Sequence, residues 1–344
     1  MNAVSQIAVR REAQAKLVAK PRLGFLGLGW IGRARMQALA DAGVAEVVAV
    51  SDVDASVVRE VAQKSDALGC ASFDQLLRQQ LDGVVIATPS ALHADQAMVA
   101  LERGIAVFCQ KPLARNLVEA TQVVATAREH NRLLGVDFSY RHVAGVAAVR
   151  EQVRAGELGD VYAIDLTFHN AYGPDKAWFY DVAQSGGGCV MDLGVHLVDL
   201  AMWVTGSTRS CALDAQLFQH GKRLSPPIAS AEDYASVQYR LDTGACVRLT
   251  CSWRLPAGTD AVIEAAFYGT RGGAALRNVN GSFYDFTVDR HDGTRCQRLA
   301  GPPDPWGARA LVDWTRKLAR GGRFDPEAEQ LVDVAAVVDR IYGR

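Results

Sequence analysis

Short apolar segments alternate with helical patterns over the first part of the chain. Five runs rich in Val, Ile and Leu predict buried strands over 23–27, 46–52, 83–88, 105–110 and 133–138. Helix signals lie between them. Ser72 and Asn116 each stand three residues before a Gln or Glu, as in a capping box, and Gly43 and Gly104 follow helical stretches. Alternating strands and helices predict an α/β fold with a doubly wound parallel sheet over residues 22–140.

The period of the pattern changes after residue 140. Three elements are predicted first, a helix, a strand and a strongly apolar helix, over 143–155, 161–170 and 189–204. Two-residue alternation then predicts two antiparallel hairpins, 235–241 with 246–255 and 262–268 with 274–278. Asp325-Pro326 marks the start of a final helix. We expect an α+β domain with a mostly antiparallel sheet over 141–344, and an N-terminal arm over 1–21.

Composition and charge narrow the function classes. The 344 residues include 37 Lys and Arg against 38 Asp and Glu, for a net charge of −1, which argues against a nucleic-acid-binding protein. No apolar run reaches the roughly 18 residues of a membrane span, and the first twenty residues lack the apolar core of a secretory signal. Seven cysteines without a C-x-x-C pair are typical of reduced thiols. We expect a cytoplasmic protein that binds neither nucleic acid nor membrane.

A glycine-rich loop joins the first predicted strand to the first helix and has the sequence Gly27-Leu28-Gly29-Trp30-Ile31-Gly32. Such glycines permit a tight turn, close approach to a pyrophosphate and close helix packing, at a helix N-terminus that favours anions. Asp52 ends the second strand, twenty residues past Gly32, where a carboxylate can accept ribose hydroxyls. It would repel a 2′-phosphate, and Val53 follows rather than an Arg, so NAD is favoured over NADP. A merely structural turn is the alternative for the glycines alone.

Polar residues also follow two later strands, at the edge where open parallel sheets bind ligands. They are Thr88-Pro89-Ser90 and Gln110-Lys111-Pro112. Lys111 directly follows an apolar strand, so we expect its ammonium at the rim of the cofactor crevice; a solvated loop lysine is the alternative. His93 either faces the crevice or lies in the first turn of a surface helix.

A polar stripe crosses the most apolar helix. Asp192, His196 and Asp199 lie at i, i+4 and i+7, on one face. Buried charge is costly unless paired, so the stripe is either a satisfied His–Asp pair in the core or a site in which a carboxylate adjusts the basicity of an imidazole. Gly194 within the helix, and the glycines at 186–188 before it, suggest that a ligand approaches closely. No metal site is expected, because Cys246 and Cys251 point to opposite faces of a strand and no three ligands converge.

Together these motifs resemble the Gfo/Idh/MocA family, the glucose–fructose oxidoreductase and inositol dehydrogenase group. The similarity runs from about Arg22 to the end of the chain and rests on the order and spacing of the motifs at 27–32, 52, 87–93, 111–112 and 186–199. It implies an N-terminal Rossmann domain and a C-terminal domain whose large, open sheet makes oligomer contacts, hence a homodimer or homotetramer. It also implies hydride transfer between NAD(P) and a hydroxyl carbon of a sugar, cyclitol or related polyol.

Carried over residue by residue, the resemblance implies that Lys111, Asp192 and His196 are catalytic. His196 would take the hydroxyl proton, Lys111 would polarise the oxygen, and Asp192 would favour the imidazolium and hold substrate. Cofactor-binding residues would be Gly27, Gly29, Trp30, Ile31, Gly32, Asp52, Thr88, Pro89, Ser90, His93, Gln110 and Lys111. The family usually has Glu before the lysine; Gln110 lacks that charge, but its amide can still bind the cofactor.

The substrate-binding residues are predicted less directly. Tyr140 and Arg141 follow the last strand of the first domain, and a loop after the 161–170 strand mixes aromatic rings with donors and acceptors, as a small polyhydroxylated ligand needs. Its candidates are His169, Asn170, Tyr172 and Trp178. An aromatic loop that only packs on the sheet is the alternative. For the whole chain, the alternatives are a non-catalytic dinucleotide-binding regulator or scaffold, and a sugar oxidoreductase or glycosidase that holds NAD tightly.

Overall fold

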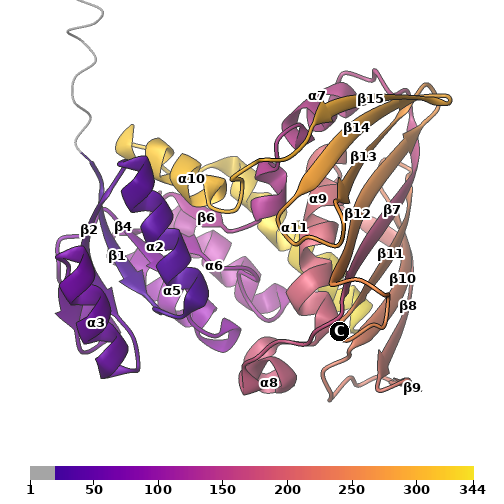
Figure 1. Cartoon of the computed structure of the whole chain (residues 1–344). Coiled ribbons are helices and arrows are strands. Elements are labelled where there is room, and N and C mark those ends of the chain that lie inside the picture. Colours follow the sequence, from indigo (N-terminus) through magenta and orange to yellow (C-terminus); the bar gives the residue numbers. More distant parts are fainter. Residues whose placement is uncertain (1–19) are drawn as a thin grey trace, which may run out of the picture.

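The computed structural model describes residues 20–344, so nearly all of the predicted N-terminal arm lies outside the described residues. A six-stranded sheet organises the first part (Figure 1). Every neighbouring pair in it is parallel, in the order β3-β2-β1-β4-β5-β6. The strands are β1 (Arg22–Leu26), β2 (Glu46–Ser51), β3 (Leu68–Cys70), β4 (Gly83–Ile86), β5 (Ala106–Cys109) and β6 (Leu134–Val136). Five of them confirm the prediction; β3 was missed because it has only three residues and one buried position.

Four of the helix ends between these strands lie at the predicted signals Ser72, Asn116, Gly43 and Gly104. The helices are α2 (Trp30–Ala42), α3 (Ala55–Ser65), α4 (Phe73–Leu77), α5 (His93–Glu102) and α6 (Leu117–Glu129). The Ser72 hydroxyl accepts from the Gln75 N–H at 3.2 Å, and the Asn116 side chain accepts from the Glu119 N–H at 2.9 Å. Gly43 adopts a left-handed φ of 63° and ends α2.

Strand register brings the functional loops to one edge of this sheet. Ile86 pairs with Leu26 and with Cys109, and Cys109 also pairs with Val136. The carboxyl ends of β1, β4, β5 and β6 therefore lie side by side, and the residues that follow each strand share one edge.

The second part is built on a nine-stranded sheet in the order β15-β14-β13-β12-β7-β11-β10-β8-β9 (Figure 1). Only β7 and β11 pair in parallel, and both predicted hairpins are present. The strands are β7 (Val161–Asn170), β8 (Ser210–Gln219), β9 (Lys222–Arg223), β10 (Tyr234–Leu241), β11 (Cys246–Ser252), β12 (Ala261–Gly269), β13 (Gly273–Asn278), β14 (Phe286–Asp292) and β15 (Arg295–Ala300). The large, mostly antiparallel sheet is thus confirmed.

Helices cover one face of this sheet: α7 (Val146–Arg154), α9 (Val195–Thr205) and α11 (Gln330–Ile341) (Figure 1). The predicted 189–204 helix begins with a π-helical turn over Val190–Gly194 before α9, and the short helix α8 (Val182–Ser185) precedes it. Contrary to the expectation, the helical stretch Val182–Thr205 is long and apolar enough to span a membrane. Its most apolar part is 94% buried, so its hydropathy is that of a core helix.

One helix of the second part returns to the first sheet. This helix, α10 (Arg309–Ala319), carries Trp314, whose ring centroid lies 5.7 Å from that of Phe108 on β5. A Cβ added at Gly83 or Gly135 would lie only 2.6 Å from the Trp314 ring, so the strand glycines make room for the indole. The predicted boundary near residue 140 divides the sheets in sequence, but α10 packs across it.

Candidate active site

The glycine loop forms an open cradle at the N-terminus of α2. Gly27 has a φ of +90°, and a Cβ there would lie 2.5 Å from the Ala87 carbonyl oxygen; a Cβ at Gly32 would lie 2.1 Å from the Gly27 carbonyl oxygen. A Cβ at Gly29, by contrast, would meet nothing within 4 Å. Two glycines therefore permit strand and helix to pack, and the third leaves uncapped helix amides open to a pyrophosphate.

Asp52 is oriented toward this loop. Its Oδ2 accepts from the Leu28 N–H at 2.6 Å and its Oδ1 from the Asp54 N–H at 3.0 Å, and each carboxylate oxygen can accept a further bond. Val53 beside it is fully exposed and Trp30 is 68% exposed, so apolar surface flanks the carboxylate. These residues fit a dinucleotide with free ribose hydroxyls.

Lys111 and Asp192 meet across the two sheets. The Lys111 Nζ donates to the Asp192 Oδ1 and to its backbone carbonyl oxygen, both at 2.6 Å. The other carboxylate oxygen accepts from the Trp253 indole N–H at 3.0 Å. Lys111 comes from the loop after β5 and Asp192 from the π-helical turn, a feature frequent at functional sites. The lysine is therefore held in place, and the interpretation of it as a solvated loop residue is wrong.

His196 lies on α9 in an aromatic pocket. Its ring centroid is 5.0 Å from that of Tyr140 and 6.1 Å from that of Phe138, and the residue is 8% exposed. Burial, together with the charges of Lys111 and Arg35, lowers the pKa of His196 well below 6.5, so the imidazole is neutral at neutral pH. Its Nδ1 is buried without a partner among residues 20–344, which leaves Nε2 as the nitrogen available to a ligand.

The expectation that Asp192 favours an imidazolium at His196 is wrong. The Asp192 carboxylate is bound by Lys111 and Trp253 instead. The third member of the stripe, Asp199, forms a buried ion pair with Arg141, whose Nε donates to Asp199 Oδ2 at 2.8 Å. The two aspartates of the stripe therefore form separate ion pairs, Asp192 with Lys111 and Asp199 with Arg141, and neither pairs with His196. Arg141, predicted to bind ligand, instead holds a core carboxylate that is 1% exposed.

Gln110 turns its amide inward. Its Nε2 donates to the Asp137 Oδ2 at 2.6 Å, and the Arg35 Nε donates to the same oxygen at 2.6 Å. The Asp137 side chain is 1% exposed, and its Oδ1 is buried without a partner in the described part of the chain. Sequence reasoning missed Asp137 and Arg35, which form an ion pair beside Gln110. This network uses the amide nitrogen of Gln110, and the contact of its amide with a cofactor stays a prediction.

His93 joins two loops rather than facing the crevice. It is 1% exposed, its Nδ1 lies 2.7 Å from the Pro112 carbonyl oxygen, and its Nε2 lies 2.7 Å from the Thr88 carbonyl oxygen. Both ring nitrogens are thus occupied, and the predicted direct cofactor contact is wrong. Its role is to position the loops after β4 and β5. Pro89 and Ser90 lie in the first of these loops.

The predicted substrate-binding residues do not converge on one site. His169 lies on the face of β7 opposite to Phe168, with its ring stacked on Tyr234 and its Nδ1 2.8 Å from the Ser252 Oγ. Strand alternation turns it away from α9, so placing it at the site was wrong. The Asn170 Oδ1 is buried without a partner in the described chain.

The aromatic candidates have neighbours of their own. Tyr140 is 7% exposed and packs against His196 and Trp306. Tyr172 is 59% exposed and donates to the Asp260 carboxylate at 2.6 Å. Trp178 stacks on the neighbouring Phe179, with ring centroids 3.8 Å apart. Of these, only Tyr140 touches a predicted catalytic residue.

The glycines at 186–188 meet protein rather than ligand. A Cβ at each would lie within 3 Å of Arg115, Tyr342 or Glu232, and a Cβ at Gly194 would be 3.2 Å from the Cys251 Sγ. The fully buried Glu232 accepts from the Gly188 and Val190 N–H groups at 2.9 and 2.8 Å and from the Tyr342 hydroxyl at 2.9 Å. It therefore caps the helix that carries Asp192 and His196. Burial raises the pKa of Glu232.

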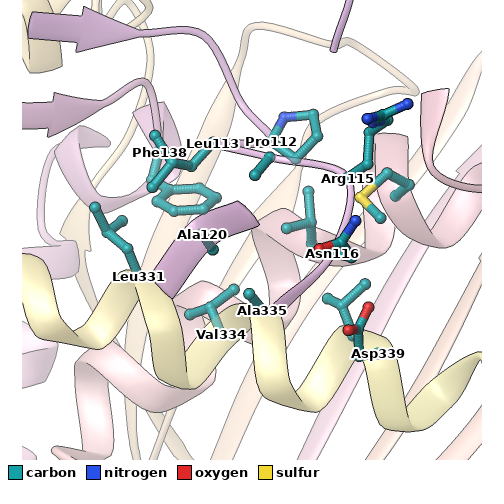
Figure 2. A pocket seen from close by; sticks show the side chains of 14 residues that line it. Pro112, Leu113, Arg115, Asn116, Ala120, Phe138, Leu331, Val334, Ala335 and Asp339 are labelled. Atoms are coloured by element: carbon teal, nitrogen blue, oxygen red, sulfur yellow. The ribbon is translucent and has the colours of Figure 1, made fainter. Parts of the chain in front are cut away.

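A narrow cavity of about 20 Å³ lies behind the Lys111 loop (Figure 2). Figure 2 shows Leu331 and Val334 of α11 facing Phe138 and Pro112. The space is enough for one water, but its apolar wall offers that water few partners. No group of three side chains able to hold a metal occurs in residues 20–344.

Known proteins match both halves of the chain. Residues 21–138 match the family described as "Oxidoreductase family, NAD-binding Rossmann fold", and residues 146–275 match the "GFO/IDH/MocA C-terminal domain". D-glucoside 3-dehydrogenase of Escherichia coli (strain K12) is 30% identical over 243 residues, 67% of this chain and 69% of that protein. Inositol 2-dehydrogenase 3 of Saccharopolyspora erythraea is 27% identical over 320 residues, 92% of this chain and 85% of that protein.

Solved structures share the whole fold. The aldose-aldose oxidoreductase from Caulobacter crescentus, complexed with glycerol, has a TM-score of 0.80 at 20% identity and covers 94% of this chain and 98% of its own. Levoglucosan dehydrogenase, in complex with NADH and L-sorbose, has a TM-score of 0.80 at 19% identity and covers 94% and 96%. These similarities show that the two-sheet architecture is common to all three chains.

Proposed function

The chain belongs to the Gfo/Idh/MocA oxidoreductase family, and from this premise we propose its cofactor preference, catalytic residues and assembly. It is an NAD(P)-dependent oxidoreductase that acts on a hydroxyl carbon of a sugar, cyclitol or related polyol. We propose NAD rather than NADP, because the Asp52 carboxylate faces the cradle and Val53 offers a 2′-phosphate no partner. The observation that supports catalysis here is the Lys111–Asp192 pair between the two sheets, near His196.

The reaction assigns a task to each of these side chains. NAD, when bound, supplies the carbon that takes or returns a hydride. The hydroxyl proton must leave as the hydride leaves, so a base must lie within hydrogen-bond reach of that oxygen. His196 suits this task because its lowered pKa keeps it neutral. Lys111, held by Asp192, donates to the reacting oxygen, and Trp253 fixes the carboxylate.

A substrate screen tests this proposal. Free sugars, inositols and sugar acids would be offered with NAD or NADP, and reduced cofactor followed by its absorbance, with His196→Ala as the inactive control. Turnover by the parent alone supports the assignment. Tight NAD binding with no turnover of any compound would favour the regulator or scaffold. Turnover that requires an added carbonyl acceptor would favour the enzyme that keeps its NAD.

We also propose a cytoplasmic homodimer or homotetramer that associates through the uncovered face of the large sheet. In residues 20–344 helices cover one face of this sheet (Figure 1), and the other carries short polar side chains such as Thr167 and Thr250, which pair across β7 and β11. The seven cysteines are all unbridged, which supports a reducing compartment. Light scattering of the parent and of Thr167→Arg tests the interface; a parent that is monomeric at micromolar concentration would contradict it.

A further inference from the structure

A second, larger cavity lies beside the catalytic pair and has no part in the reaction described above. Its volume is about 240 Å³, and it lies between the turn that carries Tyr180 and the ends of β8, β10 and β11. The side chains that matter for its chemistry are Tyr180, Gln219, His220, Asp233, Trp253 and Arg254. We call it the annex.

The annex shares one residue with the catalytic site. The Trp253 ring borders the annex, while its indole N–H donates to the Asp192 carboxylate at 3.0 Å. Trp253 is 3% exposed and is packed edge-on by Tyr180, with ring centroids 5.4 Å apart. A ligand in the annex would therefore contact the same indole that binds the Asp192 carboxylate.

The walls combine aromatic rings with donors and acceptors of both charges. The Arg254 guanidinium lies 5.3 Å above the Tyr180 ring centroid and donates to its hydroxyl at 3.1 Å. Asp233 accepts from the His220 backbone N–H at 2.8 Å, and its side chain keeps 20% of its surface exposed. Gln219 donates to the Ala231 carbonyl oxygen at 3.1 Å, which uses its amide nitrogen and not its oxygen.

Two of the wall residues hold unusual backbone conformations. Arg254 has a φ of +59° and His220 a φ of +50°, a region that residues other than glycine rarely adopt. At His220 this conformation belongs to the two-residue turn with Gly221 that joins β8 to β9, where positive φ is usual; Arg254 lies outside such a hairpin turn. Gly173 also makes room here, since a Cβ there would lie 2.3 Å from the Tyr180 hydroxyl and 2.8 Å from the Arg254 Nε.

We propose that the annex binds a second sugar ring, so that the preferred substrate is a disaccharide or other glycoside rather than a free monosaccharide. This inference rests on the proposed function, since the first ring would be the one placed at Asp192. Aromatic faces with a few placed polar groups suit a neutral polyhydroxylated ring. Asp233 and Arg254 carry opposite charges, so the walls favour neither an anion nor a cation. Each already has one protein partner, and a purely apolar group would leave their remaining acceptor and donor capacity unused.

The test compares one-ring and two-ring substrates. Glucose and galactose would be assayed beside maltose, cellobiose and lactose with NAD, using the parent and Arg254→Met, which keeps the stem and removes the charge. Arg223→Met on the neighbouring β9, exposed and outside the annex, is the matched control. We expect kcat/KM of the parent to be at least tenfold higher for a disaccharide than for its monosaccharide. Arg254→Met should remove that advantage without changing the monosaccharide value.

Each outcome is decisive. Equal kcat/KM for one-ring and two-ring substrates in the parent overturns the annex and leaves the proposed function standing. If no sugar is oxidised, the proposed function fails, and saturation-transfer NMR with the same disaccharides decides the annex separately. Binding to the parent and to Arg223→Met that is lost in Arg254→Met supports it; absence of binding to the parent overturns it.

Discussion

Replacing Gln110 by Glu would restore the residue that the family usually carries, yet we expect it to destabilise this chain. The Gln110 amide donates to Asp137 at 2.6 Å, on a carboxylate whose side chain is 1% exposed. Gln110→Glu removes the donor and sets a second carboxylate against the first. Arg35 supplies one positive charge to the shared oxygen and cannot neutralise both.

The cost follows from how the pair can relax. The introduced carboxyl restores a hydrogen bond to Asp137 only by binding a proton. At pH 7 that protonation costs about 3.7 kcal/mol, because the ordinary pKa of Glu is about 4.3 and each pH unit is worth about 1.4 kcal/mol. At pH 5 the same step costs about 1 kcal/mol. Gln110→Glu should therefore lower the free energy of unfolding by about 2 to 4 kcal/mol at pH 7, and by roughly 1 kcal/mol at pH 5.

Urea unfolding of the parent and Gln110→Glu at both pH values measures this difference directly. The matched control is the double variant Gln110→Glu with Asp137→Asn, in which the introduced amide donates to the introduced carboxylate and Arg35 keeps a negative partner. It should recover most of the loss at pH 7. A Gln110→Glu protein as stable as the parent at pH 7, with no dependence on pH, would refute the reasoning.

Three further predictions concern the site. Lys111→Ala and His196→Ala should each lower kcat by about 10² to 10⁴ with little change in NAD affinity; single-turnover and binding assays check this, and a near-parental rate for His196→Ala would contradict its role as base. NAD should bind at least tenfold more tightly than NADP by calorimetry, owing to Asp52; equal affinity would mean that the ribose carboxylate is misassigned. The lowered pKa of His196 means that only the unfolded chain binds this proton just below about pH 6.5, so stability falls there with decreasing pH. His196→Gln should reduce that slope in thermal unfolding, and an unchanged slope would contradict it.

The sequence allowed the elements to be predicted where local patterns determine them. Apolar strand runs, capping pairs and hairpin turns lie within a few residues of one another, and the strands and helices built from them are present. The π-helical turn and α10 were missed because tertiary packing determines them. His169 was misplaced because a strand shows that alternate residues face opposite ways, but not which set faces the site.

The candidate site divides in the same way. Lys111, Asp192 and His196 were found from motif spacing, and the structure brings Lys111 and Asp192 into contact. The residues that hold these side chains and Gln110 in place were not predicted. Trp253 lies 61 residues from Asp192 in sequence, and Asp137 lies 27 residues from Gln110. A single sequence has no local signal for pairs this far apart. The direction of the His196 pKa shift was predicted wrongly for the same reason, because the partners of Asp192 and the burial of His196 come from distant segments.

The packing of α10 against the first sheet bears on the order in which the chain becomes complete during synthesis. The Rossmann strands leave the ribosome first, but the groove against Gly83 and Gly135 is filled only when Trp314 has been made. Until then, the apolar surface around Phe108 lacks the helix that covers it in the complete protein. The strands of the nucleotide-binding half are therefore synthesised early, but its packing is completed only when α10 is made. A fragment that ends near residue 140 would expose that surface permanently. Chaperone binding to nascent chains should accordingly persist until residues 309–319 have emerged.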